Sequence, residues 1–193
     1  MDNSQSISAR QQILQRFEEL MRVHGIRYDT IEMVADKCGI SKKTIYKYFD
    51  SKQEMVAVII NTILDSLGTA ISTVYNSDEK PAMKLEHLFS CLYQLLGSIS
   101  MPVFYDLNKD YPKIDSRIRD FISSQKELIS KQIALGMETG DFHNDIDPDI
   151  AMEIAMAGAE KVANTDYILK NNLTVEQVIN SFKNFMKHAL IKD

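Results

Sequence analysis

Apolar residues recur three and four positions apart along most of the chain, which is the spacing of one face of an α-helix. Short polar segments with Gly, Pro or a capping side chain separate the periodic stretches. The pattern predicts about nine helices, over residues 13–24, 30–38, 42–48, 51–74, 85–99, 102–111, 114–139, 147–159 and 174–190. No stretch is convincingly a strand, so we expect an all-α fold.

Capping residues strengthen several of these predicted helix starts. Ser41 precedes the third helix as an N-cap. Ser51 with Glu54, and Thr174 with Gln177, have the spacing of a capping box, in which each side chain bonds the other residue's backbone N–H. The long apolar series after Ser51 predicts a fourth helix that joins two domains.

Composition agrees with helices and with an intracellular protein. The chain of 193 residues has only 7 Gly and 4 Pro, too few for a turn-rich β-sandwich or barrel. Cys38 and Cys91 are far apart and form no CxxC pair, which argues against a disulfide framework or a zinc finger. No leader is visible and no run approaches the ~18 apolar residues of a membrane helix. We therefore expect a cytoplasmic protein with no membrane partner and no cofactor.

Charge is unevenly distributed along the chain. The net charge of −5 argues against a generally basic nucleic-acid coat. Residues 1–60, however, carry a net charge of +1, which leaves −6 for the remainder. The segment 41–52 holds four lysines and a single carboxylate. Taken alone, such a cluster is typical of a solvated helix face, so its neighbours decide its meaning.

Those neighbours form a helix-turn-helix pattern. The predicted helices 30–38 and 42–48 are joined by a tight turn containing Gly39, and Ala35 is small enough to let them cross closely. In this motif the second helix enters the DNA major groove, and its N-terminal residues contact base edges. The candidate base-reading residues are Lys42, Lys43 and Thr44. Residues suited to phosphate contacts are Tyr46, Lys47, Tyr48 and Lys52.

Residues 30–52, TIEMVADKCGISKKTIYKYFDSK, resemble the N-terminal signature of the TetR family of transcriptional regulators. The resemblance extends over about residues 8–56. It implies a homodimer whose first three helices bind operator DNA and whose remaining helices bind a small effector and the other subunit. It also maps phosphate contacts onto Thr30, Tyr46, Tyr48 and Lys52. Cys38 departs from the family, which more often has alanine there, and we interpret it as a small buried filler.

These inferences divide the chain into two expected domains. Residues 1–54 would form the three-helix DNA-binding domain, and residues 55–193 a helical domain for effector binding and dimerisation. Candidates for lining a pocket for a small apolar effector are Met101, Phe104, Tyr105, Phe121 and Met137. Candidates for the dimer interface are Ala155, Gly158, Ala159, Phe182 and Phe185, with packing inside one subunit as the alternative.

Other kinds of site are weaker. His143, Asp145 and Asp147 could be imagined as metal ligands, but they lie in a polar segment between helices, so we expect no metal. No P-loop, G-x-S-x-G or nucleotide-binding glycine motif is present, which disfavours an enzyme. The leading hypothesis is a sequence-specific DNA-binding regulator, a repressor released from a palindromic operator by a small effector. The alternatives are an all-helical enzyme or carrier with an N-terminal adaptor, and a regulator without an effector.

Overall fold

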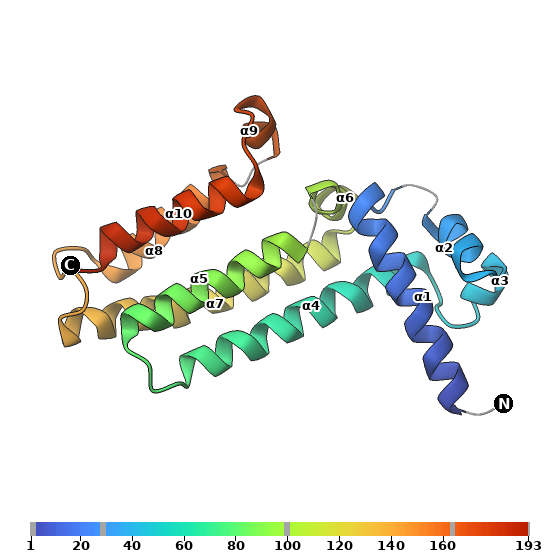
Figure 1. Cartoon of the computed structure of the whole chain (residues 1–193), viewed down its shortest axis with the longest axis horizontal. Helices are drawn as coiled ribbons and strands as arrows, with labels where there is room; N and C mark the ends of the chain where they lie inside the picture. Colours follow the sequence, from blue (N-terminus) through green and yellow to red (C-terminus); the bar gives the residue numbers. More distant parts are fainter. Residues whose placement is uncertain (1–2, 28–29, 99–100, 163–164, 193) are drawn as a thin grey trace. The chain divides into compact units, whose positions relative to one another are not determined.

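The computed structural model describes residues 3–27, 30–98, 101–162 and 165–192, and within them every regular element is a helix (Figure 1). The helices are α1 (Asn3–His24), α2 (Thr30–Cys38), α3 (Lys42–Ile45), α4 (Lys52–Tyr75), α5 (Pro81–Ser98), α6 (Met101–Asp110), α7 (Pro112–Thr139), α8 (Pro148–Val162), α9 (Thr165–Lys170) and α10 (Val175–Leu190). The expected all-α fold is confirmed.

Three helices differ most from the prediction. Helix α1 begins at Asn3, ten residues before the predicted start at residue 13. Helix α3 ends at Ile45 instead of Tyr48, because the N–H groups of Lys47 and Tyr48 bond the carbonyls three residues back, at 3.2 and 2.9 Å. These tighter bonds turn the chain before another α-helical turn can form. Helix α9 was not predicted, since its six residues are too few to show a periodic pattern.

The chain forms two compact units, and the expected functional boundary after residue 54 stays a prediction. Unit 1 comprises Met1–Asp65 with Ser98–Ile118, and unit 2 comprises Ser66–Gly97 with Arg119–Asp193. Unit 1 thus includes the first half of α4 and all of α6. Contacts between residues far apart in sequence create this division, so the local pattern could not predict it.

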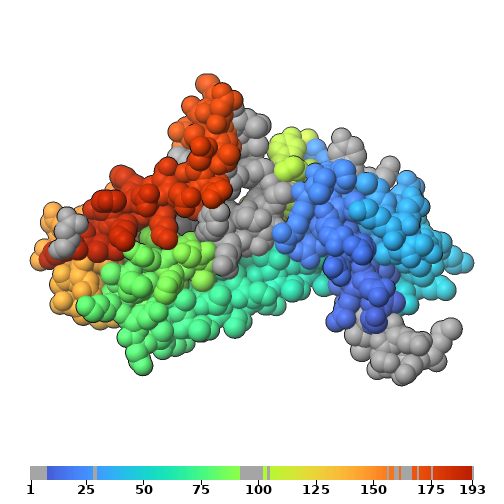
Figure 2. All heavy atoms as spheres, viewed as in Figure 1, coloured from blue at the N-terminus to red at the C-terminus, as the bar shows by residue number. Residues whose placement is uncertain are grey.

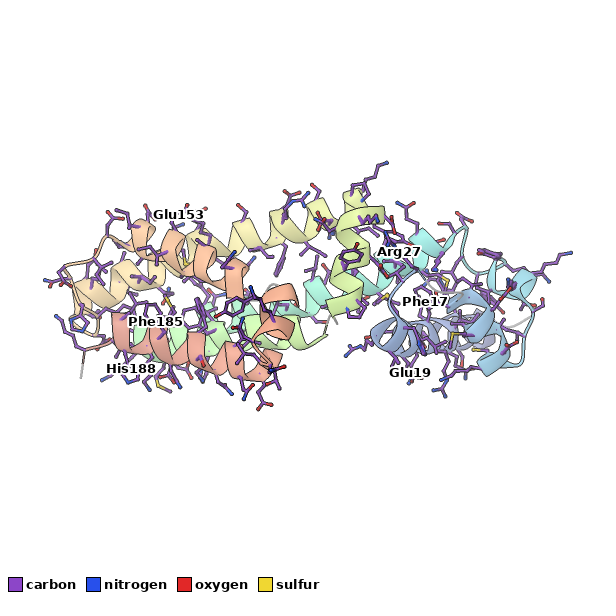
Figure 3. All side chains as sticks on the ribbon, turned by 90° about the horizontal axis from the view of Figure 1, so that it is seen from above. Phe17, Glu19, Arg27, Glu153, Phe185 and His188 are labelled. Carbon is purple, nitrogen blue, oxygen red and sulfur yellow. The ribbon has the colours of Figure 1, made fainter. Side chains whose placement is uncertain are left out.

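The core of unit 1 holds the first three helices together. Phe17 of α1 lies among the side chains of this unit and is completely buried (Figure 3). Val34 of α2, Ile45 of α3 and Phe49 are buried as well. Each of these side chains contributes about 1.5–3 kcal/mol of apolar burial, which fixes how α2 and α3 cross.

In unit 2, α8 packs against α9 and α10, while Phe89 of α5 meets Phe182 of α10 edge to face, with ring centroids 6.1 Å apart. The C-terminus closes over the segment between α7 and α8. The N–H of His143 donates to the carbonyl of Leu190 at 2.9 Å, and the N–H of Lys192 donates to that of Asp141 at 3.0 Å. Phe142, completely buried, lies between these two bonds in sequence.

Among the described residues, α4 alone is long and apolar enough to cross a membrane, with a mean hydropathy of 1.6 over its best window. The expectation that no segment approaches this composition was therefore wrong. Core helices of soluble proteins meet the same test. Helix α4 buries Met55 and Ile60 in unit 1, and Leu67 and Ile71 in unit 2. Burial within the protein thus accounts for these apolar residues.

Candidate nucleic-acid interface

The turn between α2 and α3 has the geometry that the sequence predicted. Gly39 has a φ of +64°, in the left-handed region that favours glycine. The N–H of Ile40 donates to the carbonyl of Ala35 at 2.9 Å, and the N–H of Gly39 donates to that of Asp36 at 3.2 Å. These bonds satisfy carbonyls at the end of α2 and direct the chain into α3.

Ser41 fixes the start of α3. Its side-chain oxygen accepts the N–H of Thr44 at 3.1 Å, which confirms the predicted N-cap. The inner side of the short helix is anchored by the fully buried Ile45. A cap at one end and a buried side chain on one face leave α3 little freedom to rotate, so its outward residues have a defined direction.

Most of the predicted DNA-contacting residues lie on the surface of unit 1, to which residues 30–49 contribute in light blue in Figure 2. Exposed members are Lys42, Lys43, Tyr46 and Lys47, and half-buried members are Thr44, Tyr48 and Lys52. Thr30 differs, since its exposed fraction is 0%. A side chain without exposed surface cannot hydrogen-bond a phosphate in this conformation, so the expected role of Thr30 does not fit the structure.

Within the described part of the chain, some basic residues on and near this surface pair with carboxylates, and others do not. Lys42 forms an ion pair with Glu32 of α2. Arg10 of α1 lies 3.6 Å from a carboxylate oxygen of Glu54, and its guanidinium sits 4.6 Å from the centre of the Phe49 ring.

Lys43 and Lys47 have no ion-pair partner in the part of the chain that the structure describes. Both are exposed, so their ammonium groups are available to an incoming polyanion.

The start of α4 lies beside this surface in sequence and is capped in a modified way. Ser51 accepts the N–H of Glu54 at 3.1 Å, as a capping box requires. The Glu54 carboxylate, however, accepts the N–H of Asp50 at 2.6 Å, one residue before the expected donor. Half of the predicted box is therefore present, and Glu54 also meets Arg10.

The predicted effector-pocket residues do not form one described group. The side chains of Met101 and Phe104 lie outside the described residues. Tyr105 belongs to unit 1, is 60% exposed, and its ring lies 5.4 Å from the Arg27 guanidinium, which does not fit a pocket lining. Phe121 and Met137 are half-buried in unit 2.

The predicted interface residues on α8 and α10 separate into packed and exposed positions. Ala155 is buried, and a Cβ on Gly158 would lie 3.7 Å from the Phe182 ring within the same subunit. The side chain of Ala159 is outside the described part. Phe185 is 62% exposed (Figure 3). Sequence reasoning missed Ile150 and Ile154, one helical turn apart on α8 and each 59% exposed.

Alternative sites gain no support from the geometry. No group of three potential metal ligands occurs among the described residues. Asp147 instead caps α8, since its carboxylate accepts the N–H groups of Asp149 and Ile150 at 2.9 and 3.0 Å. Burial raises the pKa of the Cys38 thiol, and the nearby positive charge of Arg16 only partly opposes this. Cys38 is half-buried, so the expectation of a fully buried filler was wrong, although a thiol that resists ionisation suits a packing role.

Comparisons with known proteins agree with the helix-turn-helix geometry. A sequence profile described as "Bacterial regulatory proteins, tetR family" matches residues 13–59. The transcriptional repressor KstR2 of Rhodococcus jostii is 27% identical over 154 residues, covering 78% of this chain and 76% of the relative. KstR2 of Mycolicibacterium smegmatis is 25% identical over 152 residues, covering 76% and 74%.

Solved structures share the fold over nearly the whole chain. KstR2 of Mycobacterium tuberculosis covers all of this chain and 98% of its own, with a TM-score of 0.70 and 22% identity. A regulator from Saccharomonospora viridis, solved with choline, covers 96% and 99%, with a TM-score of 0.78 and 19% identity. The profile match, the relatives and the capped helix-turn-helix agree: residues 13–59 resemble the DNA-binding segment of the tetR family, and the chain is similar to DNA-binding transcriptional regulators over most of its length.

Proposed function

We propose that this protein is a cytoplasmic repressor that binds a near-palindromic operator as a homodimer and leaves it when a small molecule binds. The observation that carries the DNA-binding part is the exposed surface of α3 and of the turn after it. There Lys43 and Lys47 have no ion-pair partner among the described residues, and Ser41 and Ile45 fix the helix. The relatives named KstR2 are themselves called repressors, which supports the direction of regulation.

In this proposal the N-terminal end of α3 contacts bases. Lys42, Lys43 and Thr44 would face base edges in the major groove. The residues that would contact phosphates are Tyr46, Lys47, Tyr48 and Lys52. Thr30 is left out of this set because its side chain is buried. Phosphate contacts would position the protein, and the residues of α3 would supply sequence preference.

Dimerisation would use exposed apolar positions on α8 and α10. Ile150, Ile154 and Phe185 are each more than half exposed, which is costly for large apolar side chains that remain in water. A two-fold axis would bring the same patch of each subunit together. The two copies of α3 would then meet half-sites one turn of B-DNA apart, ~34–36 Å, and the operator would be nearly palindromic.

The effector would bind in unit 2, where Phe121 and Met137 offer apolar contacts. Two structural neighbours were solved with small molecules, one with choline and one with triclosan, and KstR2 is described as a ketosteroid regulator. An effector could release this protein from DNA only by its difference in affinity between the bound and free conformations.

Selection of binding sites from random duplexes tests the DNA-binding proposal. We expect the wild-type protein to enrich a palindrome with half-sites about one helical turn apart. A Lys43→Ala, Lys47→Ala double variant should lose the enrichment while retaining the wild-type helical circular dichroism. Failure of the folded wild-type protein to enrich any sequence, or enrichment of a single half-site, would contradict the proposal.

A further inference from the structure

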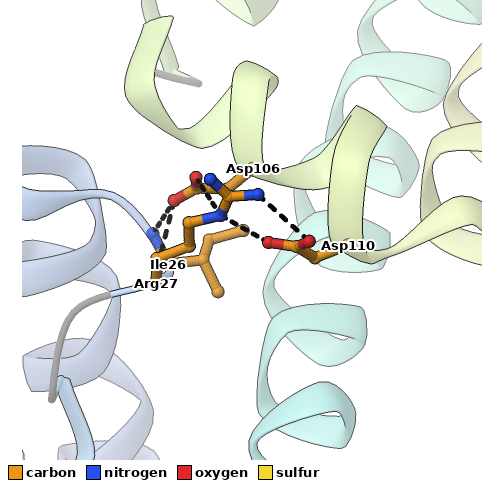
Figure 4. Close-up of polar contacts among 4 residues, drawn as sticks. All are labelled: Ile26, Arg27, Asp106 and Asp110. Carbon is orange, nitrogen blue, oxygen red and sulfur yellow. Dashed lines mark hydrogen bonds and ion pairs between the residues drawn. The ribbon is translucent and has the colours of Figure 1, made fainter.

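A buried carboxylate on α6 bonds the backbone between α1 and α2. Asp106 is only 5% exposed. One of its oxygens, Oδ2, accepts the N–H of Ile26 at 2.7 Å and the N–H of Arg27 at 3.0 Å (Figure 4). These residues lie about 80 positions away in sequence, just after the C-terminus of α1. Hydrogen bonds to an ionised group are roughly twice as strong as neutral ones.

Arg27 adds a second arm to this contact. Its Nε lies 3.3 Å from Oδ1 of Asp106 and 2.5 Å from Oδ2 of Asp110, and its Nη2 lies 3.1 Å from Oδ1 of Asp110. The pair with Asp110 lowers the pKa of that carboxyl group, chiefly through the hydrogen bond. We call Gly25, Ile26 and Arg27, together with Asp106 and Asp110, the α1–α2 clasp.

Gly25 allows the backbone N–H groups of Ile26 and Arg27 to approach the Asp106 carboxylate. Its φ of +77° lies in the left-handed region. A Cβ at this position would lie 2.8 Å from Oδ2 of Asp106 and 3.3 Å from the Cβ of Pro102. Any larger residue would therefore be strained in its backbone and would also push α6 away from the turn.

We propose that Asp106 is a positioning residue for operator binding: through the α1–α2 clasp it holds the helix-turn-helix in the orientation that a dimer needs on DNA. The proposal rests on the DNA-binding function proposed above. Helix α6 suits this role because, in the chain, it stands between α5 and α7, whose residues belong largely to unit 2. The turn after α1 is thus anchored to a helix that the chain constrains at both ends.

The clasp should matter more for an operator than for arbitrary DNA. In a dimer bound to its operator, two copies of α3 must meet half-sites at a set spacing. Without the clasp the α1–α2 turn would be mobile, and ordering it on binding would lower the affinity for the operator. Non-specific binding depends mainly on the count of phosphates neutralised, which the clasp does not change.

The test compares Asp106→Ala with Asp120→Asn, which removes the same charge from an exposed position of α7 with no ion pair among the described residues. Mass spectrometry follows amide hydrogen exchange in the peptide containing Ile26 and Arg27. Competition binding compares the selected operator with a scrambled duplex of equal length. For Asp106→Ala we expect exchange about tenfold faster. Operator affinity should be about tenfold weaker, with affinity for the scrambled duplex within about twofold.

Each outcome separates the clasp from the DNA-binding function. If the wild-type protein enriches no operator, the proposed function fails, and the positioning role of Asp106 fails with it. Exchange in Asp106→Ala equal to that in Asp120→Asn would overturn the clasp itself. Faster exchange with an unchanged ratio of operator to scrambled affinity would overturn the positioning role.

If Asp106→Ala does not fold, Arg27→Ala tests the second arm, because Arg27 is 37% exposed and its backbone bonds survive the substitution. We then expect exchange and operator affinity to change about threefold in the same directions. Values equal to those of Asp120→Asn would overturn the proposal.

Discussion

Lys43 and Lys47 are exposed cations of α3 and the turn that follows it, but they lie at different places relative to the helix start. Lys43 is in the first turn of α3, the part that reaches base edges in this motif. Lys47 lies just beyond Tyr46, the C-cap of α3, and we expect it to contact phosphates. We therefore expect the two side chains to contribute differently to binding.

Alanine substitutions distinguish these roles. Lys43→Ala should cost about 1–3 kcal/mol on the preferred operator and less on sequences altered at the contacted base. Lys47→Ala should weaken binding to all duplexes to a similar extent. Competition binding against a set of single-base operator variants measures both effects. Equal losses across the whole set for Lys43→Ala would reject its role in reading bases.

Glu32 restrains the third lysine of this surface, because its carboxylate pairs with Lys42. The Glu32→Gln substitution should free the Lys42 ammonium group for the duplex, raise affinity for a scrambled duplex about two- to tenfold, and steepen the salt dependence. An exposed pair of this kind contributes at most about 1 kcal/mol to folding, so thermal stability should hardly change.

Asp36→Asn provides the control for Glu32→Gln. It removes the same charge from an exposed position of the same helix, with no ion pair among the described residues. If both variants raise the affinity equally, the gain reflects net charge and not the release of Lys42.

At the scale of elements, close packing of α7 against the segment after it gives a stability prediction. A Cβ on Gly136 would lie 2.3 Å from the Cδ2 atom of Phe142, whose ring is completely buried. Gly136→Ala should therefore lower the free energy of unfolding by about 1–3 kcal/mol through overpacking. Urea denaturation monitored by circular dichroism measures the change.

Gly68→Ala in α4 is the matched control, because its Cβ would lie at an ordinary 3.5 Å from the Phe121 ring. Alanine should there be neutral or raise the free energy of unfolding by about 0.5–1 kcal/mol, since glycine is unfavourable inside a helix. A Gly136→Ala protein as stable as Gly68→Ala would show that the Phe142 ring yields without cost.

The sequence predicted helix ends and turns best where a short stretch of neighbouring residues determines them. The N-cap at Ser41, the tight turn at Gly39 and the capping box at Thr174 are all present. In the candidate site, exposure of the α3 lysines followed from helical periodicity. The bonds of Asp106 join residues about 80 positions apart in sequence, and no local pattern encodes such contacts.

At the scale of the whole molecule, the residues proposed to contact DNA and those proposed to contact a second subunit belong to different units. The exposed lysines of α3 belong to unit 1, within the first 60 residues, whose net charge is +1. The exposed Ile150, Ile154 and Phe185 belong to unit 2. A protein of net charge −5 thus presents an excess of cations only locally, and the proposed dimerisation would double the contact that these cations make with DNA.

This doubling predicts the salt dependence of operator binding. If each subunit neutralises about three phosphates, the slope of log affinity against log salt should be on the order of −5 for the dimer. Phe185→Asp, which places a charge in the proposed dimer patch, should reduce the slope to about half as the protein becomes monomeric. Binding titrations from low to physiological salt, with sedimentation at the same concentrations, measure both quantities. A flat slope for the wild-type protein, or an unchanged slope for a monomeric Phe185→Asp, would contradict paired α3 helices as the source of affinity.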